Sequence, residues 1–282
     1  MSDPSVVVLS GAGLSAASGV PTFRDADGLW EGHRVEDVAT PDAWTRNAPL
    51  VRTFYDERRI ACATVHPNPG HDALARLQRA WGTERVVLIT QNIDGLLQRA
   101  GCTDVIEMHG SLYRLRCEHD ASHPTVPVQG AQDADAQCAC GGRMRPDVVW
   151  FGEIPYQMEH IQEATIDCTH FVSVGTSGVV YPAAGLSQLA RAAGATTIEV
   201  NPVPCGGAFD YVIDQPSEVA LDRLISLGNS LAGVVITSGK RTFFAGGDLK
   251  GMMNVGPDNA AESFAEVEFI KADLRKLETL GK

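Results

Sequence analysis

Four short apolar runs, each bounded by polar or glycine residues, recur along most of the chain. They are rich in β-branched residues, as is typical of strands buried on both faces of a parallel sheet. Helical patterns such as Asp72–Ala80 and Ala183–Ala193 lie between them. This alternation predicts an α/β fold with a doubly wound parallel sheet. The four predicted strands are Val6–Leu9, Val86–Ile89, Phe171–Val174 and Thr197–Val200.

Small or amide side chains follow each predicted strand. Ligands of open α/β sheets bind beyond the carboxyl ends of the strands, so these positions predict one binding site along a single edge. Glycines directly after the first strand would let the backbone approach a pyrophosphate near a helix N-terminus. Their spacing departs from G-x-G-x-x-G, because the glycine after Gly13 is Gly19, and a plain strand–turn–helix junction explains them equally well. The positions are Gly11 to Ser15, Gln91 to Asp94, Gly175 to Ser177 and Asn201.

The composition narrows the class of protein. With 282 residues, 44% of them hydrophobic, the chain can bury one large domain or one domain with an appendage. A net charge of −12 disfavours contact with nucleic-acid phosphates and would tolerate basic peptides. No apolar run reaches the roughly 20 residues that span a bilayer. The N-terminus lacks a basic region and a cleavage site, so we expect a cytoplasmic protein whose seven cysteines are reduced.

Six segments give a more specific indication. GAGLSAASGVPTFRDADGLW, TQNIDGLLQRAG, MHGSLYRLRC, RPDVVWFGE, VGTSGVVYPAAG and IEVNP occur in the order found in sirtuins, and the chain resembles the class III, bacterial-type members. The resemblance covers about residues 6–225. It implies a Rossmann-type NAD domain, a small zinc module and a cleft between them. We therefore expect a deacylase domain over residues 1–226, with the module inserted at about 112–146.

The resemblance also implies which residues bind NAD. Phe23 and Arg24 would lie on a loop over the nicotinamide, and the glycine turn would follow the pyrophosphate. Taken alone, Gly175 and Asn201 would be explained by ordinary turn chemistry. The implied set is Gly11, Ala12, Gly13, Ser15, Phe23, Arg24, Gln91, Asn92, Asp94, Gly175, Thr176, Ser177 and Asn201.

His109 is the candidate general base. A lone histidine is usually structural, but its unperturbed pKa near neutrality suits proton transfer. In sirtuins the acyl-lysine carbonyl oxygen attacks the ribose carbon as nicotinamide leaves, and the histidine then activates a ribose hydroxyl. The products are lysine, nicotinamide and O-acyl-ADP-ribose. The resemblance thus implies catalytic roles for His109, Asn92 and Asp94.

The acyl group is indicated by the segment from Thr53 to Arg59, which is predicted to be helical. Tyr55 and Arg58 are spaced to share one face, and an arginine fork with a tyrosine hydroxyl can hold a carboxylate. Spacing alone favours an exposed, solvated pair. Class III sirtuins, however, carry this Y-x-x-R at the floor of the acyl pocket, which implies removal of succinyl and malonyl groups and, more weakly, acetyl groups. Arg59 is expected at the surface.

The cysteines cluster in a way that indicates a metal site rather than disulfides. Cys138 and Cys140 form a pair, but Cys117 has Asp120 where a second cysteine would be usual. His119, His123 or Asp120 could complete a tetrahedral zinc site, since zinc accepts nitrogen and oxygen. The resemblance implies a structural zinc held by Cys117, Cys138 and Cys140 plus a fourth ligand, and a decayed site without metal stays open. The remaining cysteines are expected to be buried: Cys62, Cys102, Cys168 and Cys205.

The sirtuin pattern ends at about Ser226. The segment LAGVVITSGKRTFFAGGDLKGMMNV predicts a strand–turn–helix and resembles part of the enoyl-CoA hydratase (crotonase) family. Gly247 matches the backbone N–H that forms half an oxyanion hole for an acyl-CoA thioester. The family's second donor is missing, and about 55 residues are too few to close such a core. We therefore expect residues 227–282 to be a truncated crotonase-like fragment, with Val234–Thr237 as an unpaired edge strand.

Three functions compete. The first is an NAD-dependent protein-lysine deacylase, with weak ADP-ribosyl transfer open within the same chemistry. The second, acyl-CoA hydratase or isomerase activity of the C-terminal fragment, is opposed by the missing oxyanion donor. The third, a non-catalytic NAD or peptide-binding module, is opposed by the intact segment Gln91 to Asp94 and by His109. Acyl-lysine proteins or peptides are the expected partners, with no nucleic acid and no membrane, and we expect a monomer.

Overall fold

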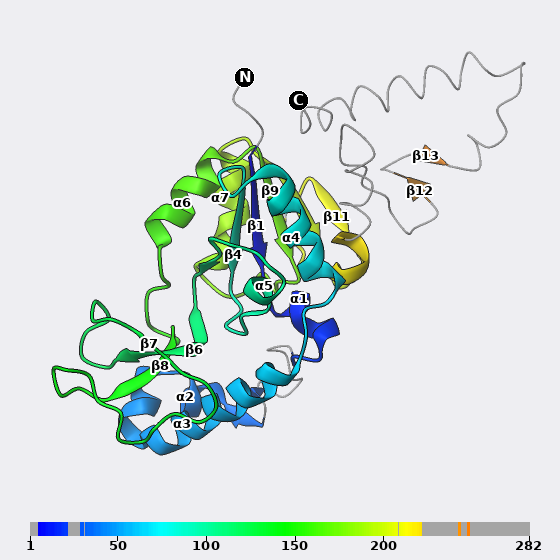
Figure 1. The fold of residues 1–282 in the computed structure, drawn as a ribbon. Coiled ribbons are helices and arrows are strands. Elements are labelled where there is room, and N and C mark those ends of the chain that lie inside the picture. Colours follow the sequence, from blue (N-terminus) through cyan, green and yellow to red (C-terminus); the bar gives the residue numbers. More distant parts are fainter. Residues whose placement is uncertain are drawn as a thin grey trace, which may run out of the picture.

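The computed structural model describes residues 5–21, 29–30, 32–207, 209–221, 242–243 and 247–248. Its centre is a six-stranded sheet in the order β11-β10-β9-β1-β4-β5 (Figure 1). Every neighbouring pair is parallel, which confirms the predicted sheet. The edge strands β5 and β11 were not predicted, because runs of two and three residues carry no periodic signal. The strands are β1 Val6–Ser10, β4 Val86–Thr90, β5 Ile106–Glu107, β9 His170–Val174, β10 Thr196–Val200 and β11 Tyr211–Ile213.

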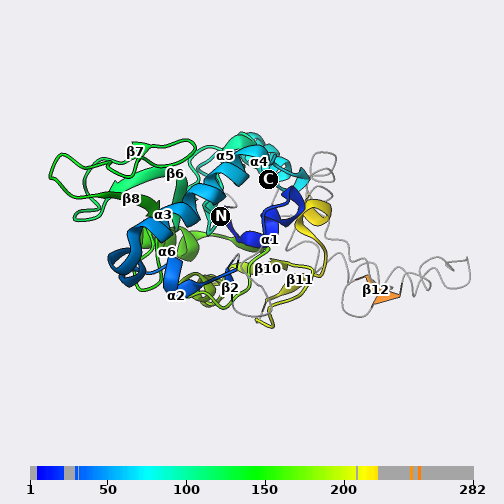
Figure 2. The same ribbon diagram turned by 90° about the horizontal axis from the view of Figure 1, so that it is seen from below.

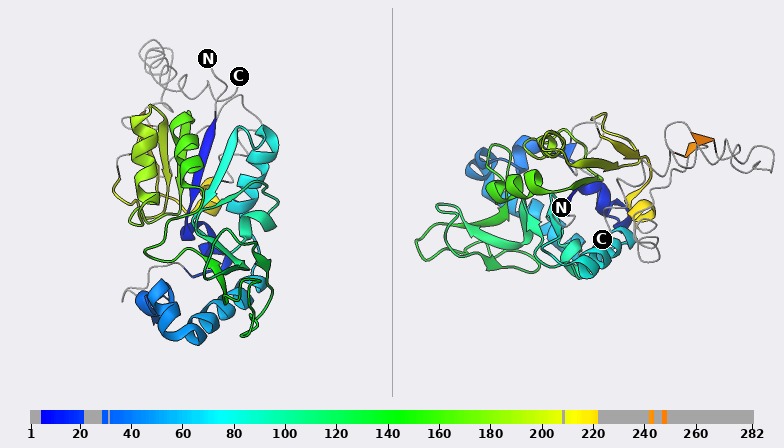
Figure 3. Two further views of the ribbon diagram at one scale, coloured as in Figure 1. Left: turned by 90° about the vertical axis from the view of Figure 1, so that its left-hand side faces the viewer. Right: turned by 90° about the horizontal axis from the view of Figure 1, so that it is seen from above.

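Helices cover both faces of this sheet, as Figure 3 shows in its left view. Alternate residues of β1 separate the two cores, because successive side chains of a strand point to opposite faces. Val8 belongs to the core under α4, with Leu74, whereas Leu9 belongs to the core under α6 and α7, with Ile161. The helices are α4 Pro69–Trp81, α5 Leu96–Arg99, α6 Met158–Asp167 and α7 Leu186–Ala192.

A smaller region lies beyond one end of the sheet (Figures 1 and 2). Its long helix α3, Pro41–Thr64, begins at Thr40, whose hydroxyl accepts a hydrogen bond from Ala43 N at 3.0 Å. Beside it is an antiparallel sheet in the order β7-β6-β8. The other elements here and in the connections are β6 Gly110–Cys117, β7 Val126–Pro127, β8 Met144–Val148, α1 Ala12–Ser15, η1 Ala16–Ser18, β2 Leu29–Trp30, β3 His33–Arg34, α2 Val35–Val38 and η2 Ala183–Gly185.

Arg59 corrects one expectation, because it is fully buried (0% exposed) rather than at the surface. Its guanidinium bonds Asp56 Oδ1 at 2.5 Å and the Gly130 carbonyl at 2.7 Å, and its Nε donates to the Leu112 carbonyl at 2.5 Å. These bonds and the Asp56 carboxylate offset much of the cost of burying the guanidinium, although Nη2 has no partner among the described residues. Arg59 therefore links α3 to the neighbouring module through hydrogen bonds.

The C-terminal segment is described only in part. β12, Thr242–Phe243, pairs antiparallel with β13, Gly247–Asp248. The predicted strand Val234–Thr237 and the other residues of the predicted crotonase-like fragment lie outside the described residues. Among the helices that are described, none combines the length and apolar character that crossing a bilayer requires.

Candidate active site

The loops that follow β1 and β9 interlock at the carboxyl edge of the sheet. Gly13 N donates to the Gly175 carbonyl at 2.8 Å, and Gly11 N donates to the Val174 carbonyl at 2.9 Å. A Cβ on Gly13 would lie 2.7 Å from Gly175 Cα, and Gly175 itself has a φ of +59°. These glycines are thus required by the packing of one loop on the other. From the sequence, these glycines were explained by the approach of a pyrophosphate or by a plain turn, and their packing against each other was not foreseen.

The predicted residues of the first two strand ends converge on one hydroxyl. Ser15 Oγ donates to Asp94 Oδ2 at 2.7 Å and accepts from Asn92 Nδ2 at 3.1 Å. Asn92 Nδ2 also reaches the Gly11 carbonyl at 3.0 Å, and the second Asp94 oxygen accepts from Leu96 N at 2.9 Å. Ser15 is fully buried, so its hydroxyl acts inside the protein to hold the amide and the carboxylate in place.

His71 belongs to the same cluster and was missed in the sequence. Its Nε2 lies 3.4 Å from Ser15 Oγ, and its Nδ1 accepts a hydrogen bond from Asn68 N at 3.2 Å. The Nδ1 contact places the ring proton on Nε2, which donates to Ser15. Burial lowers the pKa of His71 to about 4, so the ring is neutral. The available signal was the Asn68-x-x-His71 spacing at the start of α4, which forms a capping box.

His109 lies between β5 and β6, beside the second strand end. Its Nδ1 is 3.1 Å from the Gln91 carbonyl oxygen. A carbonyl only accepts, so Nδ1 carries the proton and the Nε2 lone pair is left available. Burial lowers the pKa of His109, and the Gln91 contact opposes this in part. The following Gly110 has a φ of +82°, and a Cβ there would collide with the Asp147 carbonyl, so β6 can start here only with glycine.

The third and fourth strand ends meet in the same way. Asn201 Nδ2 donates to the Thr176 carbonyl at 2.9 Å, and Thr176 Oγ1 accepts from Gly178 N at 3.1 Å. One end of the site is therefore formed by Asn201 together with the loop after β9, Gly175 to Ser177. At the other end, the buried Gln91 Nε2 has no acceptor among the described residues. A polar ligand group would satisfy that nitrogen. Phe23 and Arg24, the predicted nicotinamide loop, lie outside the described residues.

α3 carries both predicted acyl-binding residues. Tyr55 is fully buried, so the alternative of an exposed tyrosine–arginine pair is wrong. Its Oη accepts from Trp150 Nε1 at 3.0 Å. Arg58 Nη1 donates to the Phe54 carbonyl at 2.7 Å, and its guanidinium lies 3.2 Å from the centroid of the Phe54 ring. Arg58 lowers the pKa of Tyr55, against the larger effect of burial, so the two side chains are electrostatic neighbours.

Four potential metal ligands gather in the antiparallel module. The ligand atoms of Cys117, His123, Cys138 and Cys140 all lie within 4.8 Å of one another. His119 is not in this group, and its Nε2 lies 3.7 Å from Glu118. Hydrogen bonds from His123 and nearby backbone groups hold the pKa of Cys117 at about 6, although burial raises it. Three sulfurs and one imidazole are a donor set that zinc accepts in tetrahedral geometry.

The remaining cysteines follow the prediction except for one. Cys62, Cys102 and Cys168 are buried. Cys205 is only partly buried, because it follows Asn201 in the connection to β11, outside both cores of the sheet. Its N–H donates to Glu199 Oε1 at 2.8 Å, so the backbone of this connection is tied to the end of β10.

The six-stranded parallel sheet carries small and amide residues at its strand ends, with the His109 imidazole beside them. This arrangement defines a Rossmann-like α/β protein. The chain belongs to the Sir2 family, whose family model matches only residues 11–182, outside the predicted crotonase-like fragment. It is 47% identical over 211 residues to the NAD-dependent protein deacylase SIR2rp3 of Trypanosoma brucei brucei, covering 73% of this chain and 86% of that protein. It is 49% identical over 209 residues to an NAD-dependent protein deacylase of Escherichia coli O6:H1, covering 72% and 76%.

Solved structures agree on the fold. A Sir2 homologue in complex with NAD superposes with a TM-score of 0.73 at 34% identity, covering 81% of this chain and 91% of that one. A serine-to-alanine mutant of a Sir2 homologue, in complex with ADP-ribose, gives a TM-score of 0.74 at 34% identity and covers 82% of this chain and 95% of that one.

Proposed function

We propose that this protein is an NAD⁺-dependent protein-lysine deacylase acting on acylated proteins or peptides. The observation that carries the proposal is the convergence of Ser15, Asn92, Asp94 and His109 at one edge of a parallel sheet. Relatives at 47% and 49% identity are named NAD-dependent protein deacylases, and a solved homologue holds NAD. We assign this function to residues 1–226.

Each residue of the site has a role in this proposal. NAD⁺ supplies the ribose carbon that receives the acyl oxygen, with nicotinamide as the leaving group. Asn92 and Asp94 orient the ribose, while His109 Nε2 accepts a proton from a ribose hydroxyl. The buried Gln91 Nε2 offers an unused donor at the nicotinamide end. Gly11, Ala12 and Gly13 follow the phosphates, and Gly175, Thr176, Ser177 and Asn201 hold the adenosine half.

The acyl preference is proposed to be succinyl and malonyl, with weaker removal of acetyl. Arg58 offers a charged fork and Tyr55 a hydroxyl, which together suit an acyl chain that ends in a carboxylate. An acetyl group ends in a methyl and gains nothing from either side chain. The products are lysine, nicotinamide and O-acyl-ADP-ribose.

The module is proposed to hold one structural zinc through Cys117, His123, Cys138 and Cys140. The donor set fits zinc in number and kind, and the four ligand atoms are already gathered. His123 then fills the fourth position that the sequence left open.

The test is a mass-spectrometric assay of acetyl-, succinyl- and malonyl-lysine peptides, with and without NAD⁺. Arg58→Met should lower kcat/KM on succinyl- and malonyl-lysine by about tenfold or more, because a charge-assisted hydrogen bond is lost, and should change deacetylation far less. Arg52→Met is the matched control, since Arg52 lies on the same helix and bonds the Ala134 carbonyl in the module. Equal losses on all three peptides would remove Arg58 from acyl recognition.

A further inference from the structure

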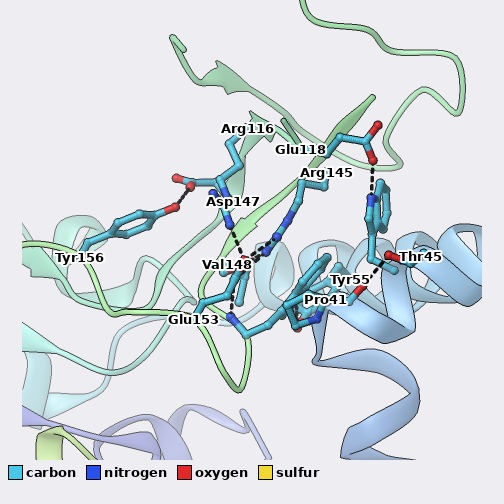
Figure 4. A network of polar contacts seen from close by, with 12 residues as sticks. Pro41, Thr45, Tyr55, Arg116, Glu118, Arg145, Asp147, Val148, Glu153 and Tyr156 are labelled. Carbon is cyan, nitrogen blue, oxygen red and sulfur yellow. Dashed lines mark hydrogen bonds and ion pairs between the residues drawn. The ribbon is translucent and has the colours of Figure 1, made fainter. Parts of the chain in front are cut away.

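Trp150 packs against Tyr55, with their ring centroids 6.4 Å apart, and it also contacts Arg145 and Glu153. Figure 4 shows Tyr55, Arg145, Glu153 and Arg116 in this polar network. Only 2% of Trp150 is exposed, and its indole Nε1 donates to Tyr55 Oη at 3.0 Å. An indole N–H donates and cannot accept, so Tyr55 Oη is the acceptor in this bond. The phenolic proton of Tyr55 must therefore point elsewhere. Among the described residues, none accepts it.

Trp150 is held at both its backbone and its ring. Its backbone N–H donates to Glu153 Oε2 at 2.8 Å. The guanidinium of Arg145 lies 3.2 Å from the centroid of its ring and is itself paired with Glu153 at 2.7 Å. Arg145 is 4% exposed, so the contact between cation and ring is desolvated and correspondingly strong. Arg116 adds a second ion pair to Glu153, at 2.7 Å.

Tyr55 is kept in its protonated form. Burial raises the pKa of its phenol, and the Trp150 hydrogen bond and the charges of Arg145 and Arg58 offset only part of that rise. At neutral pH the phenol thus always has a proton to donate. Because the indole of Trp150 already donates to Tyr55 Oη, the hydroxyl proton is directed away from the indole.

We propose that Trp150 is a positioning residue for acyl selectivity, which directs the Tyr55 hydroxyl proton toward the terminal carboxylate of the acyl chain. The inference rests on the proposed acyl pocket at Tyr55 and Arg58. With its acceptor lone pair engaged by the indole, Tyr55 donates to a carboxylate oxygen while Arg58 neutralises the charge. The ion pair of Arg145 with Glu153 keeps the indole in place. An acetyl group ends in a methyl and has no terminal carboxylate to accept this hydrogen bond, so only acidic acyl groups are bound more tightly by it.

The test is Trp150→Phe in the full chain, with kcat and KM measured separately on succinyl- and acetyl-lysine peptides at saturating NAD⁺. We expect kcat/KM on succinyl-lysine to fall by about tenfold, mainly through KM, and that on acetyl-lysine to change by less than about twofold. Trp44→Phe is the matched control. Its ring centroid lies 5.9 Å from that of Trp150, so it belongs to the same aromatic cluster, but its indole donates to Glu118 Oε2 at 2.8 Å instead of to Tyr55. That variant should keep the wild-type ratio of the two activities.

The double variant with Tyr55→Phe separates positioning from general damage. If Trp150 acts through Tyr55, removing the indole N–H in that background changes the ratio no further. Equal losses on both peptides, or fully additive losses, would overturn the role of Trp150. Wild-type protein that removes acetyl but not succinyl groups would overturn the proposed acyl preference and this inference with it. If Trp150→Phe does not fold, the bond is tested instead by NMR of the Trp150 indole ¹⁵N–¹H resonance. We expect this resonance to shift in Tyr55→Phe, because that variant removes the acceptor oxygen. A resonance that does not move rejects the bond and the proposal.

Discussion

A single backbone contact determines which nitrogen of His109 can act as a base. The Gln91 carbonyl lies 3.1 Å from Nδ1 and takes that proton as an acceptor, so Nε2 is the unprotonated nitrogen of the neutral ring. Burial favours the neutral ring as well, because the charged imidazolium is poorly solvated there. The tautomer and the charge state therefore both prepare His109 to accept a proton.

The pH dependence of deacylation should reflect this environment. A base must be neutral, and the pKa of His109 is lowered from its ordinary value of 6.5, so activity should persist below pH 6.5 and fall only at more acidic pH. The profile of kcat/KM against pH measures this. His109→Ala should abolish turnover, while His160→Ala, at an exposed position on α6, should leave both rate and profile unchanged. An acid limb above pH 6.5 would contradict the proposed environment.

Residues differ in how far the sequence could reveal them. Residues at the ends of parallel strands were predictable as neighbours, because those ends meet along one edge whatever the loops do. The burial of Arg59 was not predictable, because its partners Gly130 and Leu112 come from the module, which is distant in the sequence. His71 was missed for a similar reason, since its contact with Ser15 joins α4 to α1.

At the scale of elements, the antiparallel module combines buried strands with connections that carry the potential metal ligands. Its strands β6 and β8 run from Gly110 to Cys117 and from Met144 to Val148, slightly beyond the predicted bounds of 112–146. Much of the connection between them is exposed, including most of residues 118–131. Such a segment has no periodic pattern, and this is why the sequence could not choose among His119, His123 and Asp120.

Metal analysis of two histidine variants tests that choice. His123→Ala should lower bound zinc from one per chain and reduce Tm by on the order of 5 °C or more, because the site loses one of four ligands and a structural zinc stabilises its module. His119→Ala should retain full zinc content, since its imidazole faces Glu118. Zinc content by elemental analysis and Tm by calorimetry are the two measurements. Loss of zinc in His119→Ala with retention in His123→Ala would reverse the assignment.

At the scale of the whole molecule, the alternation of strands and helices was sufficient to predict the sheet, because β1, β4, β9 and β10 are each buried on both faces. The order of the strands was not deduced, and neither were the short edge strands. The chain segment after β11 still contributes to the core through Ala220 and Leu221, which are 3% and 4% exposed and cluster with Leu74. The proposed domain must therefore include these residues, and its boundary at 226 does so.

Truncation tests that boundary. A chain ending at residue 226 should keep the Tm of the full chain and a kcat/KM within about twofold of it, because both cores of the sheet and every proposed site residue precede residue 227. All the lysines of the protein, Lys240, Lys250, Lys271, Lys276 and Lys282, lie beyond this point, so no acyl-lysine signal can come from the truncated enzyme itself. A chain ending at residue 215 is the comparison, since loss of Ala220 and Leu221 opens the core beside Leu74 and should lower stability by about 2–5 kcal/mol. If the chain ending at 226 unfolds or loses NAD⁺-dependent activity, residues 227–282 are part of the functional domain and the assignment of a separate fragment is wrong.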